Sequence, residues 1–127
     1  VSPKKRPSYF ESYNEVDICL DTFPYPGGTI TLDSIFMGVP VVTLKGYSHF
    51  SNNGVSILSN VGHSDFVAED YDQYKGIAID LSKNLEKLTS LKESLRESLM
   101  TSPITDPRIL VDSMLNVVAR DINQMAR

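Results

Sequence analysis

The pattern of hydrophobic and polar residues predicts two short buried strands in the first part of the chain. The first covers residues 16–20 and ends at Asp21, and the second covers residues 40–44. Both are almost continuously apolar, which is typical of parallel strands that are covered on both faces. Between them, residues 29–37 carry apolar side chains at helical spacing, and Gly38 marks the expected end of a helix. The segment therefore predicts a β-loop-α-β unit with parallel strands.

The following part of the chain is predicted to be mostly helical. We expect a helix over residues 51–60, a short edge strand over 66–68, and a long helical stretch from Asp70 or Asp72 to about Met100, broken once. The apolar stripe of this long stretch consists of Ile77, Leu81, Leu85, Leu88, Leu91, Leu95 and Leu99. Its spacings mix threes and fours without a steady heptad, so we expect an amphipathic helix that faces the core, with a coiled coil as the alternative.

A last helix is predicted to begin at Asp106-Pro107, where the aspartate caps the helix and the proline occupies its first turn. Its apolar stripe consists of Leu110, Met114, Val117 and Ile122. An exposed stripe of this kind favours association between chains. We therefore expect the isolated chain to form a homodimer, and the alternatives are a helix that folds back onto the sheet or one that frays.

Composition and charge narrow the possible classes of protein. The 127 residues are 41% hydrophobic, which fits one globular domain with a buried core. The net charge of −4 argues against a general nucleic-acid or anionic-membrane binder, and no apolar run approaches the roughly 20 residues of a membrane span. The single cysteine excludes an internal disulfide and fits a cytoplasmic location. The chain lacks an initiator methionine, so we expect it to be a fragment of a longer protein.

The segment between Asp21 and Asp33 carries the most informative chemistry, because it links a buried strand to a helix. In open α/β sheets, ligands bind beyond the carboxyl ends of the strands. Gly27 and Gly28 allow the backbone to approach a ligand closely, and Thr29 is expected to cap the helix.

The first-turn amides at Ile30 and Thr31 would then lie free at the positive end of the helix dipole, which suits a diphosphate. The Asp33 carboxylate, one turn further on, can accept hydrogen bonds from sugar hydroxyls. An ordinary turn with an ordinary cap is the alternative interpretation. Neither the Gly-x-Gly-x-x-Gly fingerprint nor a Walker A loop is present, and the two histidines and one cysteine show no metal-site spacing.

An ordered set of motifs resembles the O-GlcNAc transferase and SPINDLY family of glycosyltransferases, in its bacterial branch. The motifs are Val-Asp-Ile-Cys-Leu-Asp-Thr-Phe-Pro-Tyr from residue 16, Gly-Gly-Thr from residue 27, Asp33, and Met-Gly-Val-Pro-Val-Val-Thr-Leu from residue 37 with Gly46. The resemblance continues through Ser51, the Gly-Val-Ser-Ile-Leu run from residue 54 and the C-terminal helices. It therefore covers most of the chain.

This resemblance implies a partial Rossmann-like α/β fold with flanking helices and a helical C-terminal extension. The 127 residues would be a single domain, part of the C-terminal, nucleotide-sugar-binding lobe of a GT-B enzyme that carries tetratricopeptide repeats. Such enzymes transfer a sugar, typically N-acetylglucosamine from its UDP donor, to protein Ser or Thr hydroxyls with inversion, whereas SPINDLY itself uses a fucosyl donor. A UDP-sugar and a protein acceptor are the implied partners, no cofactor is expected, and no catalytic residue is expected within this chain.

The resemblance also implies roles for particular residues. Thr29 and the amides from Gly28 to Ile30 would hold the diphosphate, and Asp33 would bind the ribose. A family lysine that contacts the nucleotide falls at Arg6, and a family histidine that stacks on the base falls at Tyr9. Tyrosine can still stack on a base but cannot act as a cation.

The chain departs from the family pattern at several positions. His-Thr-Thr is common where this chain has Gly-Thr-Ile from residue 28, and Ser-Arg is common where it has Ser51-Asn52. Ser51, Asn52 and the nearby loop residue His49 remain candidates for the cleft, with a solvent-exposed loop as the alternative for His49. These losses leave two further hypotheses open, a catalytically inactive nucleotide-sugar-binding module and a protein-interaction module.

Overall fold

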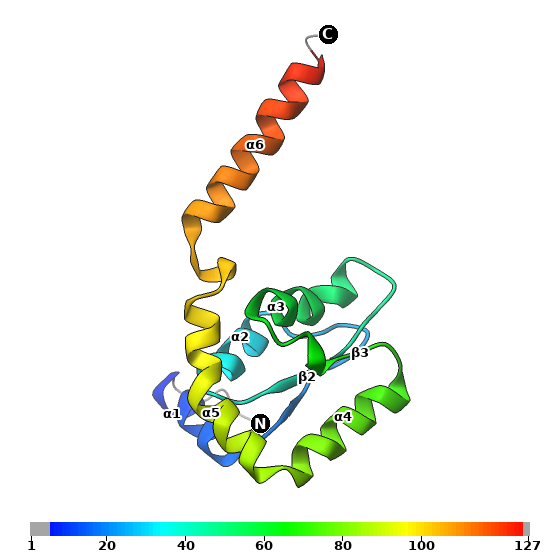
Figure 1. Ribbon diagram of the computed structural model, residues 1–127, viewed down its shortest axis with the longest axis vertical. Coiled ribbons are helices and arrows are strands. Elements are labelled where there is room, and N and C mark those ends of the chain that lie inside the picture. The colour runs from blue at the N-terminus through cyan, green and yellow to red at the C-terminus, as the bar shows by residue number, and fades with distance from the viewer. Residues whose placement is uncertain (1–5, 126–127) are drawn as a thin grey trace.

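A computed structural model of the chain describes residues 6–125, and the side chains from Ser8 onward. Three short strands form a parallel sheet in the order β1-β2-β3: β1 is Cys19–Leu20, β2 is Val41–Leu44 and β3 is Val67–Ala68 (Figure 1). Cys19 pairs with Val41 and Thr43 pairs with Val67. The predicted α/β fold with parallel strands is therefore confirmed, although β1 is shorter than the predicted residues 16–20.

Within residues 6–125, six α-helices surround or extend this sheet. They are α1 (Arg6–Glu11), α2 (Thr29–Phe36), α3 (Asn53–Val61), α4 (Tyr71–Lys83), α5 (Leu85–Met100) and α6 (Pro107–Met125). The long helical stretch is broken once, as predicted, at Asn84. Asp70 caps α4 and Asn84 caps α5, because each side chain accepts a hydrogen bond from the backbone three residues ahead.

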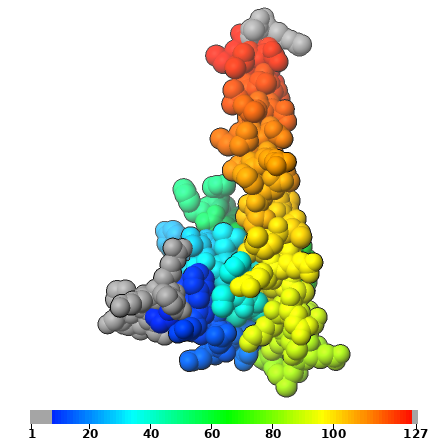
Figure 2. Space-filling view, turned by 90° about the vertical axis from the view of Figure 1, so that its left-hand side faces the viewer, coloured from blue at the N-terminus to red at the C-terminus, as the bar shows by residue number. Residues whose placement is uncertain are grey.

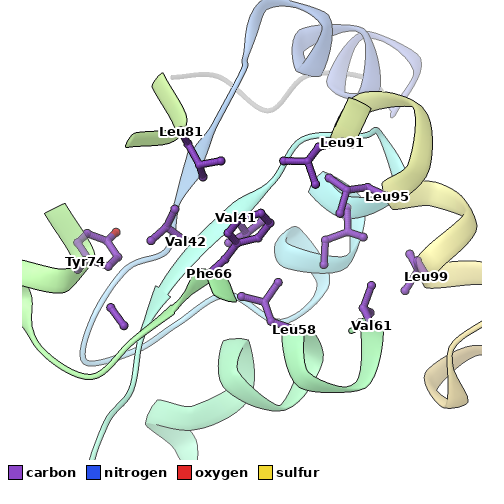
Figure 3. Packing of buried hydrophobic residues seen from close by; sticks show 12 residues of the cluster. Val41, Val42, Leu58, Val61, Phe66, Tyr74, Leu81, Leu91, Leu95 and Leu99 are labelled. Atoms are coloured by element: carbon purple, nitrogen blue, oxygen red, sulfur yellow. The ribbon is translucent and has the colours of Figure 1, made fainter. Parts of the chain in front are cut away.

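The core lies on both faces of β2 (Figure 3). Successive residues of a strand point to opposite faces. Val42 accordingly points toward Leu81 and Tyr74 of α4, whereas Val41 lies beside Phe66 (Figure 3). Both valines are at most 2% exposed. This two-sided burial explains why the strand has a continuous apolar sequence rather than an alternating one.

The stripe on α4 and α5 faces this core, with one exception. Leu81, Leu91, Leu95 and Leu99 are buried, whereas Leu85 is 75% exposed. Leu85 was expected to belong to the stripe, and this expectation is wrong: Leu85 is the first residue of α5, directly after the break at Asn84, and it lies more than a turn ahead of Leu91, the first buried leucine of that helix.

Helix α6 projects away from the body of the molecule (Figure 2). Every described side chain of α6 is exposed, including the predicted stripe. A short 3-10 turn at Pro103–Thr105, η4, joins α6 to α5. In this joint the Ser102 hydroxyl donates a hydrogen bond to the Leu99 carbonyl at 2.6 Å. Asp106 caps α6 as predicted, since its carboxylate accepts a hydrogen bond from the Arg108 amide at 2.9 Å.

Two glycines with positive φ offer a matched test of the packing. Gly38 (φ 78°) ends the segment after α2, and Gly62 (φ 86°) ends α3. A Cβ at Gly38 would lie 2.5 Å from the Lys92 carbonyl oxygen of α5, whereas a Cβ at Gly62 would meet no atom within 4 Å. We expect Gly62→Ala to lower the free energy of unfolding by about 1 kcal/mol through backbone strain alone. Gly38→Ala should lower it by about 3 kcal/mol, because overpacking adds to the strain.

Urea denaturation of both variants checks this prediction. Equal decreases in the free energy of unfolding for the two variants would contradict the prediction, because they would show that α5 can move away from residue 38 without loss of stability.

Candidate functional site

The loop of residues 22–28, called the glycine loop below, leads from β1 into α2. At the end of β1, the Asp21 amide donates a hydrogen bond to the Val42 carbonyl at 2.9 Å. The Asp21 carboxylate accepts a hydrogen bond from the Gly27 amide at 2.7 Å, and the Thr22 hydroxyl donates one to the Tyr25 carbonyl at 2.6 Å. These bonds fold the glycine loop back on itself and deliver its last residue to the start of the helix.

Helix α2 begins with unpaired backbone donors. Gly28 is the N-cap, and the first bond of the helix runs from the Leu32 amide to the Gly28 carbonyl at 3.1 Å. The expectation that Thr29 caps the helix is therefore wrong: Thr29 is the first helical residue, because the glycine takes the cap position. Within residues 6–125, the amides of Thr29, Ile30 and Thr31 donate no hydrogen bond. Such free amides at the positive end of a helix dipole suit an anion.

The side chains of the first turn differ in their surroundings. Thr29 is exposed, and Ile30 is 62% exposed at a position next to the free amides. Thr31 is buried, and a Cβ at Gly27 would lie 2.8 Å from its hydroxyl. The absence of a side chain at Gly27 therefore lets the loop pass directly over Thr31.

Tyr9 and Asp33, which sequence reasoning placed at the same site, meet in the structure. The Tyr9 hydroxyl donates a hydrogen bond to the Asp33 Oδ2 atom at 3.1 Å and lies 2.6 Å from the Tyr13 hydroxyl. Partial burial, followed by the hydrogen bonds with Tyr13 and Asp33, raises the pKa of Tyr9, so the phenol stays protonated. The other carboxylate oxygen of Asp33 receives no hydrogen bond from the described residues. Arg6 opens α1, but its side chain lies outside the described part.

The three predicted cleft residues lie in the loop after β2. The Asn52 amide group donates to the Gly46 and Ser48 carbonyls, both at 3.0 Å, and its oxygen accepts from the Gly46 amide at 2.9 Å. Ser51 is buried, and its hydroxyl donates to the Ser48 carbonyl at 2.9 Å. His49 is exposed, and its ring contacts that of Phe50 edge to face. Asn52 and Ser51 thus hold the shape of this loop.

A cavity of about 520 Å³ opens between the loops that follow the three strands. The lining includes four aromatic side chains, namely Phe23, Tyr25, Tyr47 and Tyr71. Ser51 also lines it, whereas His49 and Asn52 do not. Sequence reasoning did not find this cavity. The available signal was the aromatic residues in loops that follow predicted strands.

Two kinds of feature are absent from the part of the chain that the structure describes. No group of three or more His, Cys, Asp or Glu side chains in residues 6–125 is placed to hold a metal ion. None of the helices in that range has the length and apolar character that crossing a bilayer requires.

The sequence matches proteins that carry the same motifs. The family described as glycosyl transferase family 41 matches residues 11–114. A barley protein named probable UDP-N-acetylglucosamine–peptide N-acetylglucosaminyltransferase SPINDLY is 45% identical over 98 residues, which are 77% of this chain and 10% of the relative. The Arabidopsis thaliana protein of the same name is 43% identical over 96 residues, 76% of this chain and 10% of the relative. The chain thus spans about a tenth of the length of these relatives.

A solved structure agrees with the sequence comparison. An O-GlcNAc transferase of Thermobaculum terrenum, solved as the K341M mutant, superimposes with a TM-score of 0.86 at 34% sequence identity. The superposition covers 100% of this chain and 25% of that one. The match to residues 11–114 and the shared fold show that the chain belongs to glycosyltransferase family 41.

Proposed function

We propose that this chain is the nucleotide-binding part of a longer glycosyltransferase. That enzyme would move a sugar from a nucleoside-diphosphate donor to Ser or Thr hydroxyls of a protein. The names of the barley and Arabidopsis relatives support UDP-N-acetylglucosamine as the donor and a polypeptide as the acceptor. The single observation that carries the proposal is the set of free amides at the start of α2, next to the Asp33 carboxylate.

The site fits two parts of such a donor. The amides of Thr29, Ile30 and Thr31 would bind the diphosphate, with Gly27 and Gly28 leaving room for its approach. The free oxygen of Asp33 would accept a hydrogen bond from a ribose hydroxyl, while Tyr9 holds the other oxygen.

The proposed reaction is an inverting displacement at the anomeric carbon of the sugar. Negative charge grows on the diphosphate as its bond to the sugar breaks, and fixed amide donors stabilise that charge without reorganising. The catalytic groups that act on the acceptor would lie outside this chain, in the opposite lobe of a GT-B enzyme. Tetratricopeptide repeats ahead of the catalytic region and a cytoplasmic location belong to the same proposal.

A nucleotide-sugar-binding module without transfer activity is the second candidate. It is favoured by Ile30, which presents an exposed apolar side chain where the family resemblance implies a hydroxyl. Sugar transfer by the complete protein would exclude this candidate.

The first functional prediction concerns Asp33. In the complete protein, Asp33→Ala should weaken UDP binding by roughly 10-fold to 100-fold, because a hydrogen bond to a charged group contributes about 1.5–3 kcal/mol. Tyr9→Phe should weaken binding less, since it removes only the donor that orients the carboxylate.

Calorimetric titration with UDP measures both effects. Asp80→Ala is the matched control, because it removes an exposed helical aspartate of α4 and should leave the affinity unchanged. An unchanged affinity in Asp33→Ala would remove Asp33 from the site.

The second functional prediction concerns the isolated 127 residues. They should bind UDP only in the high micromolar range or more weakly, and they should transfer no sugar, because the other half of the cleft is absent. A radiolabelled transfer assay, run beside the complete protein and a heat-inactivated sample, measures this. Turnover above the inactivated sample would contradict the proposed division of roles.

We also propose that the isolated chain self-associates through α6. The exposed apolar stripe of α6 consists of Leu110, Met114, Val117 and Ile122, each at least 47% exposed, and burial of such surface contributes about 25 cal/mol per Å². Light scattering at tens of micromolar should show a dimer that Met114→Glu dissociates. Asn123→Glu, on the opposite side of the helix, should leave the dimer intact. A monomeric wild-type chain would exclude this proposal.

A further inference from the structure

Asp21 forms a buried junction directly beneath the proposed diphosphate site. Its side chain is almost fully inside, with the residue 8% exposed. One carboxylate oxygen accepts a hydrogen bond from the Gly27 amide at 2.7 Å, and the other accepts one from the Thr43 hydroxyl of β2 at 2.8 Å. Asp21 is therefore bonded both to the glycine loop and to the neighbouring strand.

The backbone of Asp21 is fixed as well. Its carbonyl accepts a hydrogen bond from the buried Tyr74 hydroxyl of α4 at 2.8 Å. Burial and the negative charge of Asp21 raise the pKa of Tyr74, so this donor stays protonated. Thr43 and Tyr74, which lie 22 and 53 residues further along the chain, thus both donate a hydrogen bond to Asp21.

Gly54 of α3 makes room for the Asp21 carboxylate. A Cβ at Gly54 would collide with the second carboxylate oxygen and with the Thr43 hydroxyl. A Cβ at Gly27 would lie 3.4 Å from the first carboxylate oxygen, which is close to an ordinary contact distance. Helix α3 and strand β2 are therefore packed tightly against this carboxylate.

The charge of Asp21 cannot explain its place in an anion site, because a carboxylate repels a diphosphate. Its side-chain partners are a neutral amide and a neutral hydroxyl, and no cation contacts it among the described residues. The useful property of the side chain is its shape, with two acceptor oxygens at fixed positions. One of them holds the Gly27 amide and so sets the path of the backbone into the free amides of α2.

We propose that Asp21 is a positioning residue that aligns the glycine loop, and through it the first-turn amides of α2, for the diphosphate of the donor. This inference rests on the proposed function, because it assigns Asp21 a role at the same site. Asp21 itself does not touch the nucleotide.

The experiment compares three variants of the complete protein. Asp21→Ala removes both acceptors. Asp21→Asn keeps an oxygen for the Gly27 amide and presents an amide group to Thr43, whose hydroxyl can accept instead of donate. Tyr74→Phe is the control, because it removes the buried hydrogen bond to the Asp21 carbonyl but keeps the ring that packs edge to face on Phe23 of the glycine loop.

Two measurements separate positioning from stability. Calorimetric titration with UDP should show affinity lowered about tenfold or more in Asp21→Ala but within about threefold of wild type in Asp21→Asn and Tyr74→Phe. Hydrogen-exchange mass spectrometry without nucleotide should show faster exchange of residues 22–28 in Asp21→Ala alone.

Equal affinities in Asp21→Ala and Tyr74→Phe would overturn the inference, as would an Asp21→Asn variant that binds as weakly as Asp21→Ala. If Asp21→Ala does not fold, the weak or preserved binding of Asp21→Asn still decides the question. Wild-type protein that binds neither UDP nor GDP would instead refute the proposed function, and the positioning role with it. Wild-type protein that binds UDP, with unaltered loop exchange in Asp21→Ala, would overturn the positioning role alone.

Discussion

Parallel pairing of β2 with a strand on each side is the constraint on which the rest of this structure depends. It places the carboxyl ends of all three strands at one edge, so the loops that follow them become neighbours. The apolar side chains of β2 bind helices to both faces and hold that edge in place. Thr43, at the end of the buried run, is the one polar side chain of the strand, and it donates its hydrogen bond to the Asp21 carboxylate at the end of β1.

The local elements of this fold could be predicted from the sequence because their signals are local. Asp70 and Asp106 are caps that a reader finds from neighbouring residues alone, whereas one break of the long helical stretch was expected without a position, and the structure places it at Asn84. The exposure of Leu85 was missed because periodicity describes one continuous helix, whereas Leu85 is the first residue of a new helix after the break at Asn84. The cap of α2 was misplaced by one residue, since Gly28 and Thr29 are both acceptable N-caps.

The candidate site was predictable only in part. The predictable contacts join residues that are close in the sequence, and the missed contacts join residues that are far apart in it. The glycines, the first turn of α2 and Asp33 lie within one short segment, so their proximity follows from helix geometry. The contact of Tyr9 with Asp33 joins residues 24 positions apart, and that of Tyr74 with Asp21 joins residues 53 apart. Only the folded chain reveals such pairs. The family resemblance indicated Tyr9, but no local pattern indicated Tyr74, and the aromatic residues of the cavity come from loops after three different strands.

The joint between α5 and α6 has a mechanical consequence. The Thr105 hydroxyl donates to the Met100 carbonyl at 2.9 Å, so the short turn is braced against the end of α5 rather than against the sheet. Residues 102–106 are therefore the hinge about which helix α6 would tilt. A helix of 19 residues is about 28 Å long, so a tilt of about 10° at the joint displaces its far end by about 5 Å. Small angular changes next to Leu99 would thus be converted into large translations of the far end of α6.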